Sequence, residues 1–215
     1  MALGLGLFAL GSALQAGFQP GLDLRVFGGV QYDGGMDLQT DFGLPVDPSL
    51  ASYFGLGVDY GWSGGFVAGL DLARGPLRRH TFGGPAYGVS GVIAVENSCA
   101  FLTPGWRAKL MKNMVAEARL GLGLIGVAET VQANGYPTSS YSGIGFGVWP
   151  ELRAEYEIGP WGLGLGAGYL ASLVQSLADS NGQILQNINA ANATLRTEGF
   201  TFNLFGVYHF TPLFQ

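Results

Sequence analysis

Residues 143–174 contain two stretches in which large apolar side chains alternate with glycine or charged residues. The first stretch ends at Ile158, and the alternation resumes at Trp161 after Gly159-Pro160. A repeat of two residues places the two sets of side chains on opposite faces of a β-strand. The segment therefore predicts a hairpin of two long strands. One hairpin alone leaves open which face meets lipid and which meets water or a protein core.

The same alternation recurs along the chain and predicts eight strands, which cover residues 21–32, 52–62, 66–73, 100–111, 114–128, 143–158, 161–174 and 198–210. Only a few residues follow the second, fourth and sixth strands. About fourteen to twenty-five follow the first, third, fifth and seventh, which is longer than a usual hairpin loop. Such alternation is typical of a transmembrane, up-and-down antiparallel β-barrel with short periplasmic turns and long extracellular loops. The predicted fold class is therefore all-β.

The composition supports this fold class and excludes several functions. Charged residues make up 12% of the chain, about half the usual share of a soluble domain. Glycine is abundant at 37 residues, and aromatic residues reach 13%, which argues against disorder. A net charge of −5 without a basic patch argues against nucleic-acid binding. The single Cys99 can form neither an intrachain disulfide nor a cysteine metal site, and no pattern indicates a cofactor or a metal.

Membrane insertion predicts which face of each strand points inward. Backbone polar groups in lipid must pair within the protein, so the sheet must close. The large apolar side chains then face hydrocarbon, and the glycines and charges face a narrow lumen. Five positive and six negative residues should form a lumen charge network in which opposite charges pair. They are Asp23, Arg25, Asp59, Asp71, Arg107, Lys109, Glu117, Arg119, Glu151, Arg153 and Glu155.

Aromatic residues gather where the predicted strands reach the periplasmic side. Aromatic belts of this kind mark the boundary between lipid and water. The predicted girdle consists of Tyr60, Trp62, Phe66, Tyr156, Trp161, Tyr208 and Phe210.

Residues 1–16 are apolar but too short to span a bilayer comfortably. Their small residues at Ala13 and Ala16 favour the remnant of a secretory signal peptide, with residues 17–215 as the transmembrane barrel domain. The alternation of Leu3, Leu5 and Leu7 with glycine leaves an additional N-terminal strand as the alternative.

The eight strands, the alternating loops and the aromatic last strand FTFNLFGVYHF resemble the eight-stranded outer-membrane barrels of the OmpA/OmpX/OmpW type. The resemblance implies a location in the outer membrane of a Gram-negative-type cell. It also implies contact with membrane lipid and lipopolysaccharide, insertion by the barrel-assembly machinery and a monomeric state. It implies no single activity, because function belongs to sites rather than to folds.

The expected function is a structural or surface-interaction role without catalysis. One alternative is a porin-like channel for small or hydrophobic solutes, similar to OmpW. Another is a lipid A-modifying enzyme that uses His80 with a nearby serine and carboxylate, for which Ser90, Ser98, Asp71 and Glu96 are available. A soluble barrel that binds a small ligand remains a further alternative.

Two more groups of side chains allow a specific prediction. Arg74, Arg78 and Arg79 either contact lipopolysaccharide phosphates, whose geometry matches an arginine fork, or form the solvated base of a loop. His209 should face the lumen near the periplasmic end and hydrogen-bond an interior carboxylate.

Overall fold

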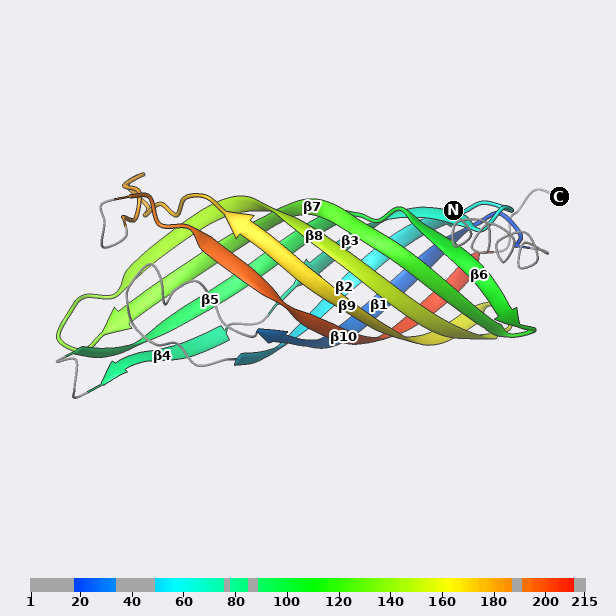
Figure 1. Cartoon of the computed structure of the whole chain (residues 1–215), viewed down its shortest axis with the longest axis horizontal. Helices are drawn as coiled ribbons and strands as arrows, with labels where there is room; N and C mark the ends of the chain where they lie inside the picture. Colours follow the sequence, from blue (N-terminus) through cyan, green and yellow to red (C-terminus); the bar gives the residue numbers. More distant parts are fainter. Residues whose placement is uncertain (1–17, 34–48, 76–77, 85–88, 187–190, 211–215) are drawn as a thin grey trace, which may run out of the picture.

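One closed antiparallel sheet forms the barrel in a computed structural model that describes residues 18–33, 49–75, 78–84, 89–186 and 191–210 (Figure 1). No helix in these ranges is long and apolar enough to span a bilayer. The strands are β1 (Gly21–Asp33), β2 (Ser49–Gly61), β3 (Phe66–Arg74), β4 (Arg78–Gly84), β5 (Val89–Leu102), β6 (Gly105–Met111), β7 (Met114–Ala133), β8 (Ser139–Ile158), β9 (Trp161–Val174) and β10 (Leu195–Phe210). Pairing of β1 with β10 closes the sheet.

The ten strands occupy eight positions around the barrel, which we call staves. Two of the staves each consist of two strands in line. β3 pairs with β5 as far as Arg74 opposite Ser98, and β4 continues the same ladder from Arg78 opposite Val95. β5 and β6 are likewise separated only by Thr103 and Pro104, and both pair with β7. A proline cannot donate to a sheet ladder, which accounts for the second break. The predicted eight-stranded antiparallel barrel is therefore confirmed.

Both described ends of the chain lie at one end of the barrel, which we call the terminal end (Figure 1). The short connections 62–65, 112–113 and 159–160 lie there too, and the opposite end is called the loop end. Two predicted loops are wrong in detail. Most of residues 74–98 belong to β4 and β5, and 129–142 belong largely to the ends of β7 and β8. Their backbones continue the sheet ladder as long hairpins beyond the other staves. The loop at 34–48 lies outside the described residues.

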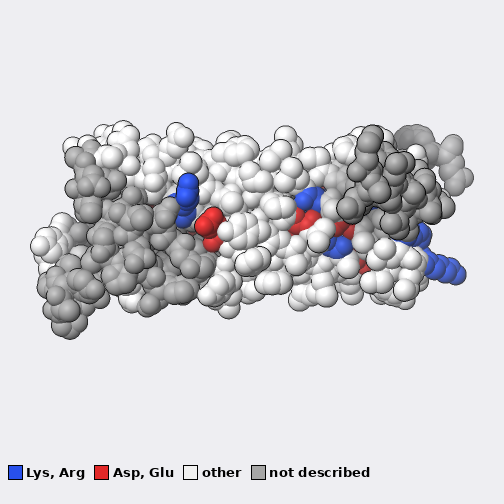
Figure 2. Space-filling model, in the orientation of Figure 1, with Lys and Arg blue, Asp and Glu red and all other residues white. Residues whose placement is uncertain are grey.

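The outer wall is apolar over the staves' length, and Figure 2 shows a surface with few charged atoms between the ends. On β10, for example, Phe200, Phe202 and Leu204 are each more than half exposed, whereas the alternating Thr201 and Asn203 are buried. An exterior of this kind is stable in hydrocarbon and unfavourable in water. The barrel is therefore of the transmembrane kind, and the soluble alternative is wrong.

The interior has two layers of different chemistry. Charged side chains fill the part nearer the terminal end, and apolar side chains fill the part nearer the loop end. Inward-facing glycines make room for both layers: a Cβ at Gly57 would collide with Arg25 and Asp71, and one at Gly164 would collide with Phe205. The glycines that face the lumen therefore leave the space that these large neighbouring side chains occupy.

Candidate functional site

The lumen charge network has Asp59 of β2 at its centre. Arg25 Nη1 donates to Asp59 Oδ2 at 2.5 Å, and Arg119 donates to both carboxylate oxygens at 2.6 and 2.8 Å. All three side chains are almost completely buried. Arg25 and Asp59 lie on the neighbouring strands β1 and β2, whereas Arg119 comes from β7, so the Arg119–Asp59 pair crosses the lumen. Charge-assisted bonds at these distances are the strong class of hydrogen bond.

Asp71 extends the network toward the opposite wall. It accepts one ion pair from Arg25 and another from Arg153 of β8, whose Nη2 lies 3.3 Å from Asp71 Oδ2. Arg153 also pairs with Glu151 of its own strand. Glu151 in turn accepts a hydrogen bond from the amide of Asn203, and the same amide donates to the Tyr53 hydroxyl at 3.2 Å. The network thus ends in neutral polar groups where it meets the apolar layer.

Toward the terminal end, the network continues through Arg107 of β6. Its Nε donates to Glu117 and its Nη1 to Asp23, both at 2.9 Å. Glu117 also pairs with Arg119, which connects this branch to Asp59. Lys109, expected in the same network, is half-buried at the terminal opening and has no ion pair with any described residue.

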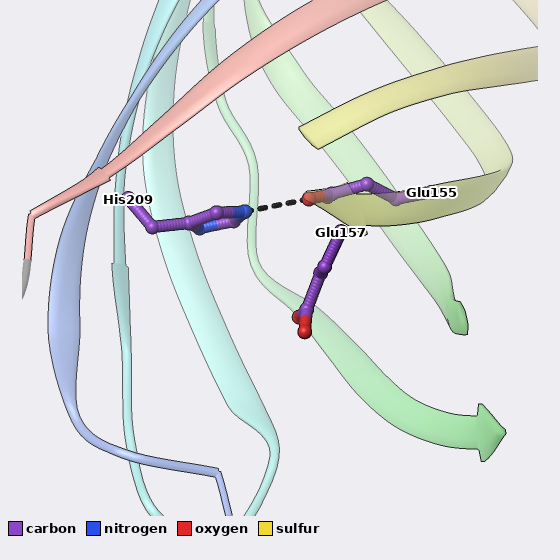
Figure 3. Close-up of side chains that lie close together, drawn as sticks. All are labelled: Glu155, Glu157 and His209. Atoms are coloured by element: carbon purple, nitrogen blue, oxygen red, sulfur yellow. Dashed lines mark hydrogen bonds and ion pairs between the residues drawn. The ribbon is translucent and has the colours of Figure 1, made fainter. Parts of the chain in front are cut away.

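His209 of β10 lies between two of these carboxylates, as predicted for a lumen-facing histidine. Its Nδ1 lies 2.7 Å from Asp23 Oδ1, and its Nε2 lies 2.6 Å from Glu155 Oε1 (Figure 3). The second bond reaches from β10 to β8 across β9, because Gly162 of β9 has no side chain in the way of Glu155. Glu157, near the end of β8, has a carboxylate oxygen within 4.8 Å of both Glu155 and His209, although its side chain is directed away from the bond between them in Figure 3.

An apolar layer, which we call the plug, lies next to the network on the side of the loop end. The alternation predicts that its residues face inward, but it does not predict that they pack together and fill the lumen. Phe27, Tyr53 and Phe101 each stack edgewise or tilted against Trp149, with ring centroids 5.7–6.2 Å apart. The Trp149 indole donates to Thr201 Oγ1 at 3.0 Å, so its polar atom is paired. Such rings fill the barrel because each covers a large area and interlocks with the next.

Part of the β9–β10 connection completes the plug at the loop end. Leu177 of the connection and Leu195 at the start of β10 belong to the same buried core as Val95 and Val174, and Ala193 of the connection is also buried. Isolated bridges hold the connection against β8 and against itself, at Ser142 with Ala178 and at Gln186 with Asn192. This connection, predicted as a polar loop, therefore folds partly over the barrel mouth.

Little free space remains inside the barrel. The cavity beside Arg25 and Arg119 has about 10 Å³, and the cavity among Tyr53, Asn97 and Trp149 has about 30 Å³. A single water needs roughly 10–15 Å³ measured in this way. At these two places, the described side chains of the network and the plug leave room for isolated waters and for no larger solute.

The residues predicted as an aromatic girdle lie together near the terminal end. Trp161 packs edgewise on Tyr208, and Tyr208 on Phe210, with centroids 4.7 and 4.9 Å apart. On β2, β3 and their turn, Tyr60 packs edgewise against Trp62, and Phe66 packs against Trp62 in a tilted arrangement. Tyr156 of β8 is exposed at the same level of the wall. These residues lie at one rim of the apolar exterior, which is where the sequence predicts an interfacial belt.

The residues of the predicted catalytic alternative are not brought together by the strand register. His80 lies opposite Ile93, whereas Ser90 lies opposite Gly83 and Ser98 opposite Arg74. Three register positions separate His80 from the nearer serine, which is roughly 10 Å along a strand. The carboxylate candidates have other partners. Asp71 belongs to the lumen network.

The predicted lipopolysaccharide contacts are described only in part. Arg74 is 61% exposed, and its guanidinium pairs with Glu96 on the outside of the barrel. The backbones of Arg78 and Arg79 begin β4, but their side chains, like that of His80, lie outside the described part of the structure.

Comparison with known proteins identifies the fold. No protein-family model and no curated protein matches the chain. A major outer membrane protein from Thermus thermophilus matches with a TM-score of 0.52 at 15% identity, over 88% of this chain and 99% of that one. OprG from Pseudomonas aeruginosa matches with a TM-score of 0.51 at 14% identity, over 92% and 99%. Ail of Yersinia pestis, in complex with the heparin analogue sucrose octasulfate, matches with a TM-score of 0.49 at 12% identity, over 89% and 100%. The chain has the fold of the outer-membrane β-barrels.

Proposed function

We propose that the protein is a monomeric, non-catalytic barrel of the bacterial outer membrane that acts through its structure and its surface. The observation that supports this function best is the filled lumen. The Asp59 network crosses the barrel at one level and the Trp149 cluster fills it at another. Because the Asp59 network and the Trp149 cluster lie one after the other along the lumen, a solute would have to displace both. The energy of displacing buried ion pairs and a packed aromatic core opposes a channel through the lumen.

The loop end supports the surface role. β4, β5, β7 and β8 continue beyond the level at which β1 and β2 end, so the protein extends farther from the membrane on this side (Figure 1). The extension carries polar residues on its outside, such as Ser98, and its inner face is packed with Ile93, Val95 and Val127. A rigid, packed extension of this kind suits contact with other molecules at the cell surface.

Lipid and lipopolysaccharide are the partners proposed for the wall and the loop end. The apolar exterior supports contact with lipid chains, and the exposed Arg74 supports contact with lipopolysaccharide phosphates. Insertion by the barrel-assembly machinery follows from the proposed location. To test the phosphate contact, the chain is refolded into vesicles with and without lipopolysaccharide. We expect binding of lipopolysaccharide to weaken in Arg74→Ala. It should be unchanged in Lys109→Ala, which alters the terminal end of the barrel. Equal binding by both variants would contradict this contact.

Conductance in planar bilayers tests the closed lumen. We expect the refolded wild-type protein to show no steady single-channel steps. The Arg119→Ala variant should also stay closed, because the Trp149 cluster remains in place. Steady wild-type conductance that changes in Arg119→Ala would show that ions pass through the charge network, and the proposed function would be wrong.

A second candidate function is passage of a hydrophobic solute through the wall beside Pro150. The ladder between β8 and β9 runs to Val148 opposite Ala171 and resumes at Glu151 opposite Gly168, so pairing is interrupted where the proline has no N–H. To test it, a disulfide is introduced between Val148→Cys and Ala171→Cys, which lie opposite each other beside the interruption, in a Cys99→Ser background that keeps Pro150. Uptake of an alkane-like probe that the disulfide blocks and a reductant restores would favour this candidate. Absence of uptake in the reduced protein would exclude it.

A further inference from the structure

Three potential metal ligands meet at the terminal end of the lumen. One oxygen of Glu155, one oxygen of Glu157 and one ring nitrogen of His209 all lie within 4.8 Å of one another (Figure 3). Glu155 and Glu157 are two residues apart on β8 and therefore point to the same side of the strand. His209 approaches from β10, across the intervening β9. Imidazole nitrogen and carboxylate oxygen together are ligands suited to first-row divalent transition metals, including Zn²⁺.

Asp23 holds the histidine in the orientation that a metal ligand needs. Its Oδ1 lies 2.7 Å from His209 Nδ1, which leaves Nε2 directed at Glu155 and into the cluster. Metal-binding histidines commonly donate the other ring N–H to a carboxylate, which fixes the ring and the tautomer. Asp23 is itself held by Arg107 at 2.9 Å. The supporting contact of a metal site is thus already present.

Glu157 differs from Glu155 and Asp23 in having no side-chain partner among the described residues. Only its backbone N–H is engaged, to the Asn113 carbonyl at 2.8 Å. Its side chain is half-buried beside an opening of about 300 Å³ at the terminal end, which Asp23, Lys109 and His209 also line. An ion and its remaining water ligands can therefore reach the cluster from this side, unlike the buried network around Asp59.

We propose that Glu155, Glu157 and His209 Nε2 bind one divalent transition-metal ion of the Zn²⁺ class at the terminal end of the barrel. Metal–ligand bonds of about 2.0–2.2 Å require the three ligand atoms to lie roughly 3.4 Å apart. Glu155 Oε1 and His209 Nε2, now 2.6 Å apart, must separate slightly, and the proton shared between them leaves for solvent. Water from the opening completes the coordination.

Such an ion would link β8 to β10, next to the pairing of the first and last strands that closes the barrel. His209 belongs to the last strand, its partner Asp23 to the first, and the two glutamates to β8. A ligand that binds only the folded state stabilises it. We therefore expect Zn²⁺ to raise the temperature at which the folded band disappears in a heat-modifiability gel. This effect does not depend on the function proposed above.

The test uses the full chain without a histidine tag, refolded in detergent and titrated with Zn²⁺ alone. We expect one Zn²⁺ per chain, with binding at least about 10-fold weaker in Glu157→Gln and in His209→Gln. Glu198→Gln is the matched control, because Glu198 is exposed on β10 toward the loop end. It should bind like the wild type. Zn²⁺ should raise the temperature at which the folded band disappears in the wild type and in Glu198→Gln only.

Two results would overturn the proposal. One is the absence of stoichiometric Zn²⁺ binding to the folded wild type. The other is equal binding by the wild type and Glu157→Gln, since Glu157 supports no ion pair in the described structure and its replacement leaves the fold intact. X-ray absorption of the bound ion gives an independent check: we expect nitrogen and oxygen ligands and no sulfur from Cys99.

Discussion

Replacement of Asp59 by asparagine tests whether the lumen network is as dry as its geometry indicates. The carboxylate accepts three charge-assisted bonds, one from Arg25 and two from Arg119. Asparagine keeps the shape but offers one acceptor oxygen, and its NH₂ group faces a guanidinium donor. The adjoining cavity of about 10 Å³ holds at most one water, so bulk solvent cannot enter to solvate the two guanidinium groups.

The magnitude follows from the partners that remain. Breaking a buried ion pair by removing one partner costs about 3–5 kcal/mol. Arg25 keeps Asp71 and Arg119 keeps Glu117, so neither guanidinium loses every carboxylate. We therefore expect a loss near the lower bound, about 3 kcal/mol in the free energy of unfolding. Glu96→Gln breaks the pair with the exposed Arg74 and should cost less than about 1 kcal/mol.

The assay is urea unfolding of the refolded barrel in lipid vesicles, followed by the fluorescence of its 4 tryptophans. The midpoint should fall for Asp59→Asn with an unchanged slope, because a changed slope would indicate a different folded or unfolded state. A loss below about 1 kcal/mol, equal to that of Glu96→Gln, would refute the reasoning. It would mean that water reaches the network and screens its charges.

Two further substitutions test the wall and the packing of the barrel in the same unfolding assay. Leu204→Arg places a charge on the lipid face midway along β10 and should cost about 2–4 kcal/mol, whereas a negligible cost would contradict a lipid-facing position. Gly123→Ala drives a methyl group into the backbone at Ala100 and should cost about 1–3 kcal/mol. Gly126→Ala on the same strand has its nearest contact at 3.9 Å and should stay within about 0.5 kcal/mol. Equal costs for the two glycines would contradict the packing.

Alternation was sufficient to predict the staves because a lipid-facing wall and a filled lumen impose opposite requirements on neighbouring positions. The stretch Phe200 to Phe205 shows this most clearly, with exposed and buried residues in turn. The same rule did not predict β4 or the far part of β7. Above the membrane the outer face is polar or small, as at Ser98 and Ala128, so the contrast between faces weakens and a strand looks like a loop.

Contacts across the lumen could be predicted only as a class. Nearly equal numbers of opposite charges indicated pairing, but partners such as Arg119 and Asp59 are 60 residues apart and no local pattern relates them. The Trp149 cluster was missed as a unit for the same reason. Its rings come from four strands, and each one appears in the sequence as a single aromatic residue among small, polar or charged residues on the same face. The grouping of His209 with Glu155 and Glu157 likewise depends on barrel closure.

The most direct test of the closed transmembrane barrel is a heat-modifiability gel on residues 17–215 refolded into detergent, with circular dichroism of the same sample. We predict a band that migrates faster unboiled than boiled, together with a β-sheet spectrum. A chain that stays soluble without detergent and shows no shift on boiling would contradict the account, because its exposed leucines and phenylalanines would then have to be buried in a core.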